Sequence, residues 1–124
     1  MGWRIVFAMF LAWIGCSSAA EIGVSDRSIT IGMTAPFSGP NGAYGQDMKA
    51  VILSYFRQVN ESGGVFGRKL ELLSEDDGYE TETAVANTRK LIAQEKVFAL
   101  LASYGSSPTT TAMNEVFGVA RVPP

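Results

Sequence analysis

The side chains best suited to chemistry in this sequence are hydroxyls and carboxylates that follow apolar segments. Ser106 and Ser107 directly precede Pro108, a residue that favours the first turn of a helix. The free N–H groups and the positive dipole end at the start of a helix favour an anion such as a ligand carboxylate. Capping of the helix by Ser107 explains the same residues, so a ligand site and a plain helix start both stay open.

A tyrosine in a glycine-rich turn is the second candidate for ligand contact. Tyr44 lies in the turn Gly42-Ala43-Tyr44-Gly45, where an aromatic ring with a polar tip could cover an apolar ligand. The alternative is a surface tyrosine that packs beside the following helix. We predict Tyr44, Ser106 and Ser107 as the ligand-binding residues of the chain.

The sequence gives little support for a catalytic, metal-binding or cofactor site. Asp76 and Asp77 form a carboxylate pair at the end of a predicted strand, where acid–base catalysis or a cation site must be weighed. Neighbouring side chains on a strand point to opposite faces, which favours structural or solvated roles. The sequence has no histidine, and its single cysteine is Cys16, which excludes histidine-dependent nucleophiles and the usual zinc sites. We predict no catalytic residue, metal site or cofactor.

The first 20 residues have the layout of a secretory signal. A cation at Arg4 precedes the apolar run Ile5 to Ile14, and small residues close the segment at Ser18-Ala19-Ala20. The apolar run is shorter than the roughly 20 residues that a membrane-spanning helix needs, which favours cleavage after Ala20. An uncleaved anchor and lipidation at Cys16 are the alternatives.

Removal of this leader leaves roughly 104 residues, the size of one small domain. The whole chain has 10 Lys and Arg against 12 Asp and Glu. Loss of Arg4 changes the formal net charge from −2 to −3. This mild acidity argues against a surface that tracks nucleic-acid phosphates.

The hydrophobic pattern predicts strands that alternate with helices. Alternating apolar and polar residues predict strands over Ser28–Thr34 and Lys69–Glu75, and the apolar run Val97–Ala102 predicts a buried central strand. Apolar side chains at helical spacing follow each strand. They are Met48, Val51, Ile52, Tyr55, Phe56 and Val59, then Ala84, Val85, Thr88, Leu91 and Ile92, and finally Ala112, Met113, Val116 and Phe117.

This alternation predicts an α/β fold with a parallel sheet flanked by helices. The edge-like second strand and the buried third strand favour the strand order 2-1-3-4, with a fourth strand opening at Val122-Pro123. In that order, loops 35–45 and 103–107 follow neighbouring strands, at the end of the sheet where open α/β sheets bind ligands. We therefore expect Tyr44 and Ser106 to lie side by side at this end.

Several short motifs occur in an order typical of one protein family. They are Ile31-Gly32-Met33-Thr34-Ala35-Pro36-Phe37-Ser38-Gly39-Pro40, Tyr44-Gly45-Gln46-Asp47, Asn60 to Gly67 with Arg68-Lys69-Leu70, Asp76-Asp77, Ala84-Val85-Ala86-Asn87, Lys90-Leu91-Ile92 and Val97-Phe98-Ala99-Leu100. The ordered set resembles the start of the type I periplasmic solute-binding proteins, in particular the branched-chain amino acid (Leu/Ile/Val) binding family of ABC importers.

The resemblance implies a non-enzymatic protein whose two hinged lobes capture a small solute, such as an amino acid, small carboxylate or amide, in the periplasm. The solute would pass to an inner-membrane permease, and the complete protein would be a monomer that binds no nucleic acid. Residues 1–20 would be a signal peptide, and residues 21–124 the incomplete N-terminal lobe. Tyr44 matches a tyrosine that lines the ligand cleft. Ser106, with Ser107 as the neighbouring register, matches a serine that hydrogen-bonds the ligand carboxylate.

One local departure and two other functions accompany this resemblance. Tyr104-Gly105 replaces the family's residues before the serines, which predicts a different pocket shape. The same fold also serves as the ligand-sensing ectodomain of membrane receptors. A small flavodoxin-like enzyme is the third reading, and the lack of histidine together with the export leader disfavours it.

Overall fold

The computed structural model describes residues 21–117. The predicted signal peptide, Cys16 and the fourth strand expected at Val122-Pro123 lie outside the described residues. None of the helices in the described range combines the length and apolar character that a membrane span requires. The elements, in chain order, are β1 (Ser28–Ala35), α1 (Gly42–Glu61), β2 (Lys69–Asp76), α2 (Thr81–Ala93), β3 (Ala99–Leu100), α3 (Ser106–Ala112) and a π-helical turn, η1 (Met113–Phe117).

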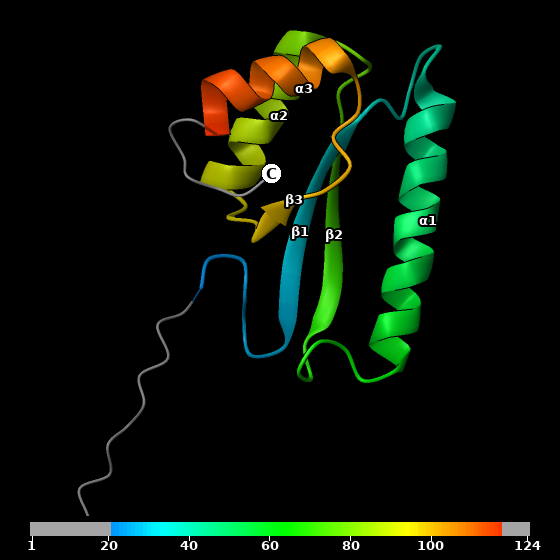
Figure 1. Ribbon diagram of the computed structural model, residues 1–124, viewed down its shortest axis with the longest axis vertical. Helices are drawn as coiled ribbons and strands as arrows, with labels where there is room; N and C mark the ends of the chain where they lie inside the picture. The colour runs from blue at the N-terminus through cyan, green and yellow to red at the C-terminus, as the bar shows by residue number, and fades with distance from the viewer. Residues whose placement is uncertain (1–20, 118–124) are drawn as a thin grey trace, which may run out of the picture.

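The strands form a parallel sheet in the order β2-β1-β3 (Figure 1). β1 lies in the middle and pairs with β2 along its whole length. On the other edge of β1, Ile31 and Gly32 pair with Ala99 and Leu100 of β3. The order confirms the 2-1-3 part of the predicted sheet, and it brings the carboxyl ends of all the strands to one end of the sheet.

The helices cover both faces of the sheet. α1 lies along one face, and α2 and α3 lie together on the other (Figure 1). β2 lies on one side of β1 and β3 lies on the other, so the connection from β1 to β2 and the connection from β2 to β3 run in opposite directions across the sheet. Because both connections are right-handed, their helices α1 and α2 lie on opposite faces. The cores on the second face are small clusters of buried apolar side chains: Leu91, Val97 and Leu100 in one, and Val85, Ala112 and Val116 in the other, with Ile92 packed against both.

β3 is shorter than the predicted strand Val97–Ala102. Val97 and Leu100 are buried, but Phe98 and Leu101 are exposed, and Ala102 leaves the strand with a φ of 57°. Within residues 21–117, a strand lies beside only one edge of β3. The burial expected of a central strand is therefore only partly present in the described residues.

α1 begins earlier than predicted. The expected loop 35–45 ends at Asn41, and Gly42 to Gly45 form the first turn of the helix. Glycine is required at position 45, because a Cβ atom there would overlap the Pro36 carbonyl oxygen. This close approach lets α1 start directly against the segment that leaves β1, so Tyr44 lies on a helix rather than in a mobile loop.

Two of the three predicted helical stripes are only partly buried. In α1, Phe56 is buried while Val51 and Tyr55 are 71% and 62% exposed, because the sheet covers one row of the stripe only. In the last helix, Ala112 and Val116 are buried as predicted, but Met113 is exposed. The helix changes from α3 to the π-helical turn η1 at Met113.

Candidate ligand-binding site

Asp76 connects two loops at the carboxyl end of the sheet. Its Oδ1 atom accepts hydrogen bonds from the N–H groups of Phe37 (2.8 Å) and Gly78 (2.9 Å). The hydroxyl of Ser38 and the N–H of Phe37 stabilise the charged carboxylate and hold the pKa of Asp76 below its ordinary value. The carboxylate therefore ties the β1–α1 loop to the β2–α2 loop.

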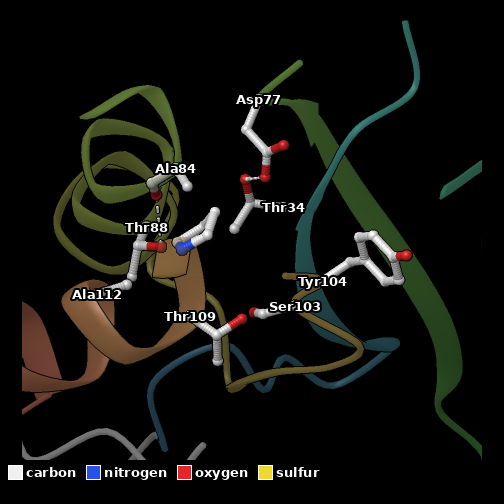
Figure 2. Close-up of a pocket in the computed structure, with 9 residues that line it drawn as sticks. Thr34, Asp77, Ala84, Thr88, Ser103, Tyr104, Thr109 and Ala112 are labelled. Carbon is white, nitrogen blue, oxygen red and sulfur yellow. Dashed lines mark hydrogen bonds between the residues drawn. The ribbon is translucent and has the colours of Figure 1, made fainter. Parts of the chain in front are cut away.

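Asp77 is buried and anchors a different pair of groups. Its Oδ2 atom accepts a hydrogen bond from Thr34 Oγ1 at 3.0 Å (Figure 2), and its Oδ1 atom accepts one from the Tyr79 N–H at 2.9 Å. Burial raises the pKa of Asp77, because desolvation disfavours the charged form. Each aspartate thus organises its own stretch of backbone, in agreement with the structural roles that the sequence favours. Residues 21–117 hold no group of three or more His, Cys, Asp or Glu side chains that could bind a metal ion.

Three tyrosines from separate segments meet at this end of the sheet. Tyr44, from the first turn of α1, stacks on Tyr104, from the β3–α3 loop, with ring centroids 5.6 Å apart and planes 13° from parallel. Tyr79, from the β2–α2 loop, meets the Tyr104 ring at 5.9 Å and 55°. We call these residues the tyrosine cluster. Among its members the sequence analysis assigns a ligand role to Tyr44 alone, although each ring follows the carboxyl end of a strand.

Unusual backbone conformations hold these rings in place. Tyr79 and Ala102 have φ angles of 69° and 57°, in the left-handed region that residues other than glycine rarely adopt. Gly105 has a φ of 105°, and a Cβ atom there would lie 2.9 Å from the Tyr79 ring. The conformations of the two non-glycine residues cost about 1–3 kcal/mol each, so contacts elsewhere in the two loops must compensate for this strain.

Ser106 and Ser107 both lie within the first turn of α3. The residue before the helix is Gly105, and no side chain caps the helix. The prediction that Ser107 caps a helix opened by Pro108 is therefore wrong, because the glycine lets the helix start two residues earlier. Ser106 is exposed, whereas Ser107 Oγ lies 3.2 Å from Thr81 Oγ1 of α2.

Tyr44 and Ser106 lie at the same end of the sheet, as the predicted strand order requires. The first turns of α1 and α3 lie at the same end of the sheet (Figure 1), and the ring of Tyr44 stacks on Tyr104, two residues before Ser106. The hydroxyl of Ser107, in contrast, is used in the contact between α2 and α3. The structure thus brings Tyr44 and Tyr104 into contact, and Ser106 begins α3 at the same end of the sheet.

A small polar cavity lies beside this surface (Figure 2). It has a volume of about 10 Å³, and Thr34, Asp77, Ser103 and Thr109 are among its lining residues. The Thr109 hydroxyl is buried there without a hydrogen-bond partner in residues 21–117. The volume corresponds to about one water molecule, so this cavity is too small to hold an amino acid.

Comparison with known proteins places this geometry in a family. Residues 28–124 match the model described as periplasmic binding protein. The Leu/Ile/Val-binding protein homolog 3 of Brucella melitensis is 31% identical over 117 residues, which cover 93% of this chain and 30% of that protein. An amino acid binding protein of Pseudomonas aeruginosa is 31% identical over 94 residues, which cover 76% of this chain and 25% of that protein.

A solved structure supports the same assignment. The branched-chain amino acid transporter substrate binding protein LivJ of Streptococcus pneumoniae, in complex with isoleucine, superposes with a TM-score of 0.72 at 30% identity. The alignment covers 78% of this chain and 28% of that structure, so the chain spans less than a third of the length of these relatives. The family match shows that this chain belongs to the periplasmic binding protein family, whose members are binding proteins and not enzymes, and the shared fold is that of part of a type I lobe.

Proposed function

We propose that the protein containing this chain is the solute-binding component of an ABC importer, which captures a small solute and delivers it to an inner-membrane permease. The single observation that carries the proposal is the stacking of Tyr44 on Tyr104 at the end of the sheet where α3 begins with Ser106, in a chain whose family binds solutes. Ligands of open α/β sheets bind at this end of the strands. The solute class is an amino acid, a small carboxylate or an amide.

Each predicted site residue has a distinct role in this proposal. Tyr44 is 57% exposed, and its ring covers the apolar part of the solute. The exposed Ser106 hydroxyl donates a hydrogen bond to the solute carboxylate, a charge-assisted bond of the stronger kind. Ser107 contributes less to solute binding than Ser106, because its hydroxyl already contacts Thr81.

The organisation of the chain follows from the same proposal. Residues 1–20 direct export to the periplasm and are removed after Ala20, with lipidation of Cys16 as the alternative. Residues 21–124 then supply the N-terminal part of the first lobe. The remaining contacts to the solute come from residues beyond this part of the fold, in keeping with the open surface that the tyrosine cluster presents.

A thermal-shift screen of the complete gene product tests the proposal. The screen uses the L-amino acids, small carboxylates and small amides, and calorimetric titration then measures the Kd of each compound that raises the melting temperature. A ligand that binds only the folded protein raises its melting temperature in proportion to RT ln(1 + [L]/Kd). Stabilisation by a member of these classes supports the proposal, and the absence of any stabilising member would refute it.

Uptake measurements separate the importer from a ligand-sensing ectodomain. Cells that produce the complete protein should accumulate the radiolabelled ligand identified in the screen, and deletion of the gene should abolish that accumulation. Ligand binding by the purified protein with unchanged uptake in the deletion strain would favour the receptor.

A further inference from the structure

The stacked tyrosines present an aromatic surface with one open end. One face of the Tyr44 ring lies against Tyr104, nearly parallel and 5.6 Å away between centroids. Tyr44 is nevertheless 57% exposed, so a large part of this residue stays accessible beside the stack. Tyr104 lies in the middle of the cluster, between Tyr44 and Tyr79. A further planar group can therefore join the stack on Tyr44.

The backbone that carries two of the rings is held in position before any ligand arrives. The backbone of Tyr79 is held by the bond from its N–H to buried Asp77, and its ring packs where Gly105 leaves room. The backbone beside Tyr44 is held by the close approach of Gly45 to Pro36. A tyrosine on such a backbone, already stacked on a second ring, loses less conformational entropy on binding than a mobile one.

The geometry also distinguishes between possible partners of the rings. Recognition of a quaternary ammonium group requires aromatic faces arranged around the cation. Tyr44 and Tyr104 instead lie within 13° of parallel and against each other, which leaves no space for a cation between them. An aliphatic side chain would gain from burial against Tyr44 but would gain nothing from the orientation of the stack.

We propose that the solute carries a planar aromatic ring that stacks on Tyr44, together with a carboxylate that reaches Ser106. This inference rests on the proposed function and narrows its solute class to aromatic amino acids and aromatic carboxylates. Tyr104 is the specificity-determining residue, because it holds the Tyr44 ring in the stacking orientation. Aromatic stacking adds about 2- to 13-fold in Kd beyond the burial of equal area.

Pairs of ligands that differ only in ring saturation test the inference. Calorimetric titration of the complete gene product uses L-phenylalanine against L-cyclohexylalanine, and phenylacetate against cyclohexylacetate. We expect the aromatic member of at least one pair to bind about 2- to 13-fold more tightly. The pair that binds distinguishes an amino acid site from a carboxylate site.

Three variants link this preference to the cluster. Tyr104→Phe should retain the preference for the aromatic ligand, and Tyr104→Leu should reduce it to a ratio near one. The matched control is Tyr55→Leu on the exposed side of α1, which should leave the ratio unchanged. If Tyr104→Leu impairs folding, as judged by its melting temperature, Tyr44→Leu is measured in its place with the same expected loss.

Several results would overturn the inference. They are equal or tighter binding of the saturated ligands, a preference that survives both Tyr104→Leu and Tyr44→Leu, and tight binding of tetramethylammonium in place of the aromatic acids. Tight binding of L-leucine without binding of either aromatic ligand would overturn the inference while supporting the proposed function. Failure of every amino acid, carboxylate and amide would refute both.

Discussion

Replacement of Thr34 by valine should reveal how strongly the buried carboxylate of Asp77 supports the candidate site. Thr34 is buried, and its hydroxyl donates a 3.0 Å hydrogen bond to Asp77 Oδ2. Valine keeps the branched shape of the side chain, so the change removes the donor without opening a large cavity. A hydrogen bond to a charged group contributes about 1.5–3 kcal/mol, and we expect the free energy of unfolding to fall by about this amount.

The size of this effect depends on the charge of Asp77. In an Asp77→Asn background the partner of Thr34 is a neutral amide, for which a hydrogen bond contributes about 0.5–1.5 kcal/mol. The effect of Thr34→Val should therefore be smaller in that background, and the difference between the two effects measures the coupling of the two side chains. Valine should also raise the pKa of Asp77 further, because one of the hydrogen bonds that favours its charged form is lost.

Urea unfolding of the complete gene product at pH 7, followed by circular dichroism, provides the assay. Thr110→Val is the matched control, since Thr110 is exposed in α3 and should change the free energy of unfolding by no more than about 0.5 kcal/mol. An effect of Thr34→Val as small as that of the control would refute the role given to this hydrogen bond. An equal effect in both backgrounds would show that the Asp77 charge is irrelevant to it.

Three further predictions follow from the same contacts. Gly45→Ala should lower the free energy of unfolding by about 1–3 kcal/mol, because the Cβ atom of the alanine would overlap the Pro36 carbonyl. The control Ser54→Ala, at an exposed position of α1, should have little effect in the same urea assay. Asp76 has a folded-state pKa below the ordinary value of 3.8 that it has in the unfolded chain, so its contribution to stability is present above that value and is lost as the pH falls through the folded-state pKa. Asp76→Asn should accordingly destabilise the protein at pH 7 and lose this effect in strong acid, and an effect that grows with acidity would contradict the sign. Ser106→Ala should weaken carboxylate ligands by about 1–3 kcal/mol in calorimetric titration while Thr110→Ala does not, and unchanged affinity would remove Ser106 from the site.

Local patterns in the sequence predicted much of the fold. The predicted strands Ser28–Thr34 and Lys69–Glu75 agree with β1 and β2 to within one residue at each end. The predicted stripe of α2 also lies on its buried side. These features depend on the alternation of side chains within one segment. The confirmed 2-1-3 order needed only the contrast between an edge-like and a buried strand.

Features that depend on distant contacts were predicted less well. The start of α1 depends on the approach of Gly45 to Pro36, which no helical pattern reveals. The start of α3 depends on the backbone of Gly105, and the change to a π-helical turn at Met113 has no counterpart in the apolar spacing. Each is a property of backbone geometry and not of hydrophobic spacing.

The candidate site, too, could be predicted only in part from the sequence. The prediction that the turns of Tyr44 and Ser106 share one end of the sheet follows from strand order alone. The tyrosine cluster, however, joins one residue from the first turn of α1 with residues from two loops, and its stacking distances and ring angles arise only when the strands are aligned. A useful signal was present in the sequence all the same, since a tyrosine follows each strand within nine residues of its end.

The position of the bound solute is the most direct test of this account. A crystal structure of the complete gene product with the tightest ligand from the thermal-shift screen gives that position. We predict a solute whose apolar part contacts the Tyr44 ring and whose carboxylate accepts a hydrogen bond from the Ser106 hydroxyl. A solute bound at the opposite end of the strands, near Ser28 and Lys69, would contradict the account.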